Sequence, residues 1–229
     1  MKRFLLCMAI GLLVVLGGCF AQKQRYRPLF EQNTTPLTMR HSALESHKRM
    51  IHVWRGLREN NPDLYAIRAR LDNAWSRDPG WFEPYWGWGI FRLVQAGQTQ
   101  PSLFTVECFT DSVRYLFMAR SMDSFPDDEK LNIDMDIANS LNGLGACLLV
   151  LKEKDQANRA LVHARDILAS ATPLTEDSKP RYFELQAYCM FYLGDIAAAK
   201  EAANEALKYG ASLPEDFMAE LAAASEELK

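Results

Sequence analysis

Histidines and clustered acids are the residues of this chain whose types suit proton transfer or metal binding. The four histidines are His41, His47, His52 and His163. They form no His-Glu-x-x-His pair, and no acid or cysteine stands beside them at the spacing of metal ligands. We therefore expect surface imidazoles, with no metal, no cofactor and no catalytic residue. The protein is not predicted to be an enzyme.

A group of carboxylates follows Pro126. Its members are Asp127, Asp128, Glu129, Asp134 and Asp136. Their spacing does not fit a calcium-binding EF-hand loop. Because the amino end of a helix stabilises negative charge, helix capping is the favoured role. No phosphate-binding loop and no Gly-x-Ser-x-Gly motif occurs in the sequence.

Charge and composition indicate a folded domain without a nucleic-acid partner. The 229 residues include 26 Lys and Arg against 29 Asp and Glu, which gives a net charge of −3. Nucleic-acid binding requires a dense basic footprint, and this chain has no basic block. The hydrophobic share of 48% and the charged share of 24% are ordinary for a globular protein.

The N-terminus has the pattern of an export signal. Lys2 and Arg3 precede an apolar run over 4–16 that is shorter than the roughly 20 residues of a transmembrane helix. The run ends in Leu16-Gly17-Gly18-Cys19, which resembles the lipobox of bacterial lipoproteins. The resemblance implies that 1–18 is a signal peptide and that Cys19 is lipidated after cleavage. The alternative is an ordinary secretory signal that happens to contain a cysteine.

The lipobox resemblance also implies a location. Several acyl chains on Cys19 would hold the protein on a membrane durably, facing the periplasm of a bacterial envelope. Phe20 stands where Asp commonly marks retention in the inner membrane, so the outer membrane is favoured over the inner. The segment 19–37 is predicted to be the lipidated cysteine and a flexible tether, because 20–36 lacks periodicity and ends in Thr-Thr-Pro.

The remainder, 38–229, is predicted to be all-α. Helix-favouring residues dominate it, and no strand-like alternation appears. Helices of about 12–20 residues are expected between the breaks. The breaks fall at 60–62, 78–80, 97–101, 125–127, 172–173, 179–180, 194–195 and 210.

Two copies of a helical pattern lie in the second half of the chain. The first copy has Leu141, Leu144, Gly145 and Leu148, then Ala157, Leu161 and Ala164; the second has Phe183, Ala187, Met190, Leu193 and Gly194, then Ala199, Ala203 and Ala206. The pattern resembles the tetratricopeptide repeat (TPR). The resemblance implies a superhelix, a solenoid of antiparallel helix pairs, in which Gly145 sits where two helices touch. A generic helical bundle is the alternative.

The repeats depart from the family pattern in places. The two copies are 42 residues apart rather than the family's 34, and an insertion is expected over about 95–109. We expect four helix pairs and a C-terminal capping helix over 214–228, with Phe217 and Leu221 facing the last repeat. Cys147 and Cys189 occupy equivalent places in successive first helices. Packed helix axes stand about 8–10 Å apart, so these two residues are expected to be core thiols.

The resemblance places a partner-binding groove on the concave face of the first helices. The residues assigned to it are Trp86, Ile90, Asn139, Asn142, Arg181, Glu184, Tyr188 and Tyr192. Rings and amides suit a protein or peptide partner, and Asn142→Ala is expected to leave folding nearly unchanged. The alternative is that these rings pack within the fold.

These features predict a membrane-anchored protein–protein adaptor that acts in the assembly of an envelope complex. A rival hypothesis is a helical envelope enzyme, a hydrolase or a carbohydrate-active protein. It would use the tryptophan-rich region around 75–91 as a cleft and an acid such as Glu83 for catalysis. A third is a purely structural protein whose partner is another copy of itself.

Overall fold

The computed structural model describes residues 41–59, 61–171 and 174–227, and within these ranges the chain is helical and contains no strand. The predicted signal peptide, the predicted lipidation site Cys19 and the predicted tether lie outside the described residues. The helices are α2 (His41–Leu57), α3 (Leu64–Arg77), α4 (Phe82–Gly97), α5 (Leu103–Arg120), α6 (Lys130–Val150), α7 (Lys154–Ser170), α8 (Lys179–Leu193), α9 (Ile196–Lys208) and α10 (Glu215–Glu227), with a short 3₁₀ turn, η4 (Asp127–Glu129), before α6.

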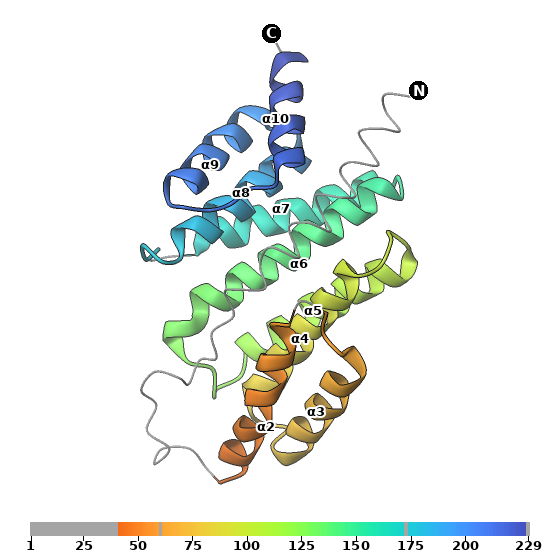
Figure 1. Cartoon of the computed structure of the whole chain (residues 1–229), viewed down its shortest axis with the longest axis vertical. Helices are drawn as coiled ribbons and strands as arrows, with labels where there is room; N and C mark the ends of the chain where they lie inside the picture. Colours follow the sequence, from red (N-terminus) through yellow and green to blue (C-terminus); the bar gives the residue numbers. More distant parts are fainter. Residues whose placement is uncertain (1–40, 60, 172–173, 228–229) are drawn as a thin grey trace.

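Consecutive helices pack as pairs. α2 lies against α3, α4 against α5, α6 against α7 and α8 against α9, and α10 packs on α9. Figure 1 shows the pairs stacked along the long axis, from α2 and α3 at one end to the blue α8, α9 and α10 at the other. The predicted all-α, TPR-like arrangement is therefore confirmed, with four pairs and a capping helix in the described part of the chain.

Small residues set the distance between the paired helices. A Cβ atom placed on Gly145 of α6 would lie 2.5 Å from Leu161 Cγ of α7, and one on Gly89 of α4 would lie 2.6 Å from Leu116 Cγ of α5. Ala157 and Ala164 on the facing side of α7 have no exposed surface. Gly145 thus occupies the helix contact predicted from the repeat pattern.

Local chemistry fixes the helix ends close to the predicted breaks. Side-chain oxygens of Asp63, Ser102 and Asp195 accept bonds from backbone N–H groups in the first turns of α3, α5 and α9, as N-cap residues do. Gly194 and Gly210 follow α8 and α9 with φ of 83° and 85°. A residue with a Cβ is disfavoured in this left-handed region, so both glycines end their helices cleanly.

The insertion expected over 95–109 does not exist. α4 continues to Gly97, and α5 begins at Leu103, so five residues connect an ordinary helix pair. The first turns of α5 lack the repeat's pattern of alanine contacts. Residues 103–109 nevertheless form the start of α5. Thr105 and Cys108 in this segment are buried, so contacts with the rest of the fold stabilise it as helix.

The C-terminal helix closes the last repeat as predicted. Phe217 has no exposed surface and Leu221 is buried. The Phe217 ring lies 4.5 Å from the Tyr188 ring and 5.4 Å from the Phe191 ring, measured between centroids. α10 therefore covers apolar rings of α8 that would otherwise face water.

The three cysteines within the described ranges, Cys108, Cys147 and Cys189, are buried free thiols. This confirms that Cys147 and Cys189 are core thiols. Burial raises the pKa of Cys189 to about 12, and it also raises the pKa values of Cys108 and Cys147. No helix among the described residues has the length and apolar character needed to cross a membrane.

Candidate partner-binding site

The groove residues come from the first helices of three successive pairs. Trp86 and Ile90 lie on α4, Asn139 and Asn142 on α6, and the remaining four on α8. Positions three or four apart share one face of a helix. Each helix can therefore present its members of the set together, as the repeat pattern predicts.

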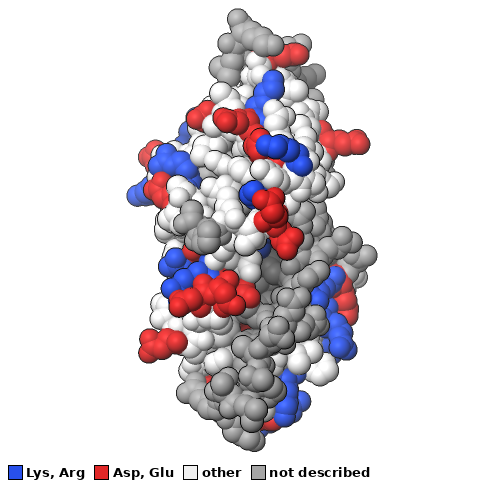
Figure 2. All heavy atoms as spheres, turned by 90° about the vertical axis from the view of Figure 1, so that its left-hand side faces the viewer, with Lys and Arg blue, Asp and Glu red and all other residues white. Residues whose placement is uncertain are grey.

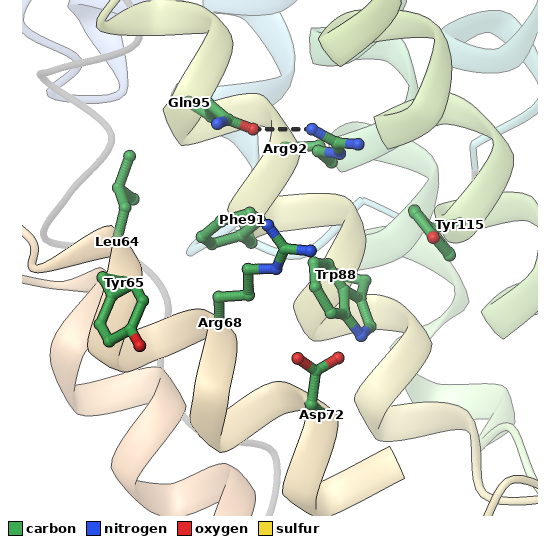
Figure 3. A pocket seen from close by; sticks show the side chains of 9 residues that line it. All are labelled: Leu64, Tyr65, Arg68, Asp72, Trp88, Phe91, Arg92, Gln95 and Tyr115. Atoms are coloured by element: carbon green, nitrogen blue, oxygen red, sulfur yellow. Dashed lines mark hydrogen bonds between the residues drawn. The ribbon is translucent and has the colours of Figure 1, made fainter. Parts of the chain in front are cut away.

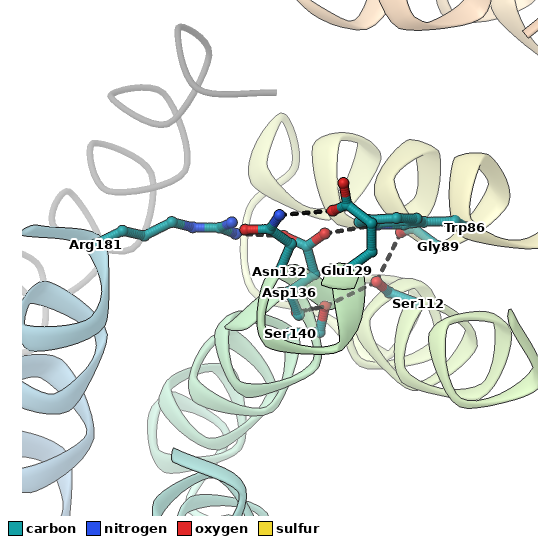
Figure 4. A network of polar contacts seen from close by, with 8 residues as sticks. All are labelled: Trp86, Gly89, Ser112, Glu129, Asn132, Asp136, Ser140 and Arg181. Atoms are coloured by element: carbon teal, nitrogen blue, oxygen red, sulfur yellow. Dashed lines mark hydrogen bonds and ion pairs between the residues drawn. The ribbon is translucent and has the colours of Figure 1, made fainter. Parts of the chain in front are cut away.

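Asp136 connects these three helices. The Trp86 Nε1–H donates a 2.7 Å hydrogen bond to Asp136 Oδ2, and the Arg181 guanidinium forms an ion pair with Asp136 Oδ1. The Asp136 carboxylate has no exposed surface and Arg181 is 8% exposed. Figure 4 shows the indole of Trp86 and the guanidinium of Arg181 reaching Asp136 from opposite sides. We call Trp86, Asp136 and Arg181 the Asp136 site.

Two serines support the Asp136 site from behind. Ser140, one turn after Asp136, donates to the Asp136 backbone carbonyl at 2.9 Å, and its Oγ lies 2.8 Å from Ser112 Oγ of α5. The Ser112 hydroxyl donates to the Gly89 carbonyl at 2.7 Å. These bonds tie α4, α5 and α6 together where Asp136 must be held (Figure 4).

Trp86 and Ile90 also belong to the larger hydrophobic core. The Trp86 ring is 5% exposed and packs 6.2 Å from Trp54 and 5.7 Å from Phe125, between ring centroids. Ile90 has no exposed surface. Trp86 and Ile90 therefore pack within the fold, as the alternative interpretation expected. Trp86 belongs to the Asp136 site only through its bond to Asp136.

Asn142 holds α6 against α8. Its side chain is 4% exposed, and Nδ2 donates to the Leu185 backbone carbonyl at 2.9 Å. The expectation that Asn142→Ala would leave folding nearly unchanged stays a prediction: truncation removes a buried bond between two repeats and also an Oδ1 atom that is buried without a partner. Asn139, one turn earlier, is 8% exposed.

The α8 residues span a range of burial. Glu184 and Tyr188 are 5% and 7% exposed, and the Tyr188 ring rests on Phe217 of the capping helix. Tyr192 is half-buried, with its ring centroid 5.7 Å from that of Phe191. Tyr192 is thus the more accessible of the two tyrosines.

Glu129 adds an unusual carboxylate beside Asp136. Its pKa is raised to about 7, because burial disfavours the charged form and Asp128 and Asp136 repel it, while a hydrogen bond from the Asn132 amide opposes the rise. Near neutral pH this carboxyl group therefore carries a partial charge.

The acids after Pro126 were expected to cap a helix, and they do lie at the start of α6, but the N-cap residue makes no capping bond with its side chain. That residue, Glu129, precedes the first turn of α6. Asp134 pairs with Arg120, and Asp136 bonds across helices to Trp86 and Arg181. The sequence analysis assigned Asp136 to helix capping and missed its contacts with Trp86 and Arg181, although its place three residues before Asn139 was a usable signal.

The acid of the rival enzyme hypothesis is enclosed. Glu83 has no exposed surface and lies 2.9 Å from His47 Nδ1. It accepts hydrogen bonds from the indoles of Trp54 at 2.8 Å and Trp81 at 3.3 Å. Glu83 therefore joins α2 to α4. His47 is not the surface imidazole that was expected, although His52 and His163 are exposed.

Among the described residues, no three His, Cys, Asp or Glu side chains are grouped so that they could hold a metal ion. Comparison with protein families, with curated proteins and with solved structures finds no family model, no relative and no structure that matches this chain.

Proposed function

We propose that this protein is a lipid-anchored adaptor of the bacterial envelope, held by Cys19 and facing the periplasm. Phe20, which stands where Asp commonly marks inner-membrane retention, favours the outer membrane over the inner. The protein would bind a protein or peptide partner along the first helices. The observation that carries the proposal is the Asp136 site, a buried polar cluster through which three successive repeats hold their first helices together as one wall. Solenoids bind extended partners along such stacked walls.

The character of the wall supports a protein partner. The half-buried Tyr192 supplies a ring to the wall, and tyrosine is enriched among binding hot spots. On the face shown in Figure 2, basic and acidic side chains are interspersed. That face lacks the single basic stripe that a nucleic acid needs.

The test is capture of a partner from envelope extracts with a groove variant. Tyr192→Ala should reduce partner recovery about tenfold or more, because it removes the accessible ring of the wall. Trp86 and Arg181 are spared, since they hold the repeats together.

The matched control is Phe104→Ala, which removes an exposed ring from α5, a second helix. Circular dichroism and membrane fractionation must match the wild type for both variants. Unchanged recovery with Tyr192→Ala would remove the partner site from the concave face.

A further inference from the structure

A cleft opens between α3 and α4 (Figure 3). It lies on the other face of α4 from Trp86 of the Asp136 site. Trp88 follows Trp86 by two positions, and at about 100° per residue their rings point to opposite faces of α4. The cleft has a volume of about 420 Å³, within the range of about 300–1,000 Å³ usual for ligand pockets. It is lined by Tyr65, Arg68 and Asp72 of α3, Trp88 and Phe91 of α4, and Tyr115 of α5.

The floor of the cleft is aromatic. The Trp88 ring stacks on Tyr115 with centroids 5.9 Å apart and lies 5.3 Å from Phe91 in an edge-to-face arrangement. Both contacts hold the indole in place. Tyr65 on the rim is 86% exposed, although tyrosine is a residue that interfaces commonly bury. The cleft thus offers fixed rings inside and an exposed ring at its mouth.

Charged groups along the cleft differ in how they are paired. Arg92, at one end, forms an ion pair with Asp111 at 2.8 Å and donates to Gln95 Oε1 at 2.9 Å. In the part of the chain that the structure describes, Arg68 and Asp72 form no such pair. Figure 3 shows the Arg68 guanidinium extended toward Phe91 and Trp88, with the Asp72 carboxylate below Trp88. Arg68 is therefore a cation available to a ligand.

We propose that this cleft binds an extended peptide segment of a partner protein in which an acidic residue adjoins an aromatic one. The carboxylate would accept paired N–H bonds from Arg68, and the ring would pack on Trp88 and Tyr65. Asp72 lies one turn from Arg68, and its carboxylate repels an acidic residue placed at the Asp72 end of the cleft. The acidic residue of the peptide must therefore point toward Arg92.

The dimensions agree with a short segment. Leu64 and Asp72 bound the α3 wall, and the eight steps between these residues rise about 12 Å along the helix. An extended chain advances about 3.3 Å per residue, so the cleft accommodates about four residues. A ligand that presents only one side chain would contact either the aromatic rings of the cleft or the Arg68 charge, but not both.

The test is fluorescence anisotropy of a labelled hexapeptide of alternating glutamate and phenylalanine, titrated with the full chain in lipid nanodiscs. Saturable binding is expected, and a peptide with lysine in place of glutamate should bind at least about tenfold more weakly. Arg68→Ala should also weaken binding about tenfold, and Tyr65→Ala should weaken it severalfold. Both side chains are exposed, so neither change should alter the circular dichroism spectrum.

Arg70→Ala is the matched control, because Arg70 is an exposed arginine of the same helix that does not line the cleft. The proposal is overturned if no binding is seen up to about 1 mM, if the lysine peptide binds equally well, or if Arg68→Ala and Arg70→Ala have equal effects. A dimer of the chain that Arg68→Ala dissociates would assign the cleft to a second copy and overturn it too. Tyr192→Ala should leave peptide binding unchanged, which separates this site from the concave face.

Discussion

Gly145→Ala tests the helix contact on which the repeat depends. The new methyl group would stand 2.5 Å from Leu161 Cγ and 2.7 Å from Cδ2, closer than carbon atoms approach without strain. Leu161 is 1% exposed, so it has little room to move. The substitution therefore combines a stabilising effect, the higher helix propensity of alanine, with a destabilising one, the steric clash with Leu161.

Their magnitudes can be compared. Alanine is favoured over glycine inside a helix by about 1 kcal/mol, whereas overpacking a close contact costs about 1–3 kcal/mol. A net loss of about 1 kcal/mol is expected. With Leu161→Ala already present, which itself costs about 2–5 kcal/mol, the steric term disappears. In that background Gly145→Ala should stabilise the protein by up to about 1 kcal/mol.

Urea denaturation followed by circular dichroism measures all four members of this cycle. Asn158→Ala on exposed α7 surface is the control for helix propensity alone and should be neutral or slightly stabilising. The reasoning is refuted if Gly145→Ala stabilises the wild-type background as much as it stabilises the Leu161→Ala background. α6 and α7 would then not be in the close contact described.

Three further outcomes can be measured. Glu83→Ala removes the acceptor used by the buried Trp54 indole N–H and by the partly buried Trp81 indole N–H, so the free energy of unfolding should fall by about 3 kcal/mol in urea titrations; a loss below about 0.5 kcal/mol would contradict the buried network. Cys108, Cys147 and Cys189 should resist a thiol reagent at pH 8 in the folded protein, because burial raises their pKa values, and all three should react in denaturant; rapid labelling before unfolding would be inconsistent with their burial. Cys19→Ser should abolish palmitate incorporation and leave uncleaved precursor in membrane fractions, and a labelled Ser variant would rule out the lipidation proposal.

The sequence by itself determined the helical class, most of the helix boundaries and the repeat contacts. These features depend on local chemistry: N-cap side chains such as Ser102, stop signals such as Gly194, and small residues such as Gly145 at fixed spacing. It misplaced 103–109, because nothing local distinguishes an inserted loop from a helix whose apolar contacts come from other repeats.

Tertiary structure alone decided which side chains meet. Asp136 lies 50 residues from Trp86 and 45 from Arg181 along the chain, and only the stacking of α4, α6 and α8 brings the three together. The same holds for Trp86 and Trp88, neighbours in sequence that serve the core and the cleft. The helical period predicts on which face of a helix a residue lies. The elements packed against that face determine whether the residue joins the core, bonds to another helix or stays open to a ligand.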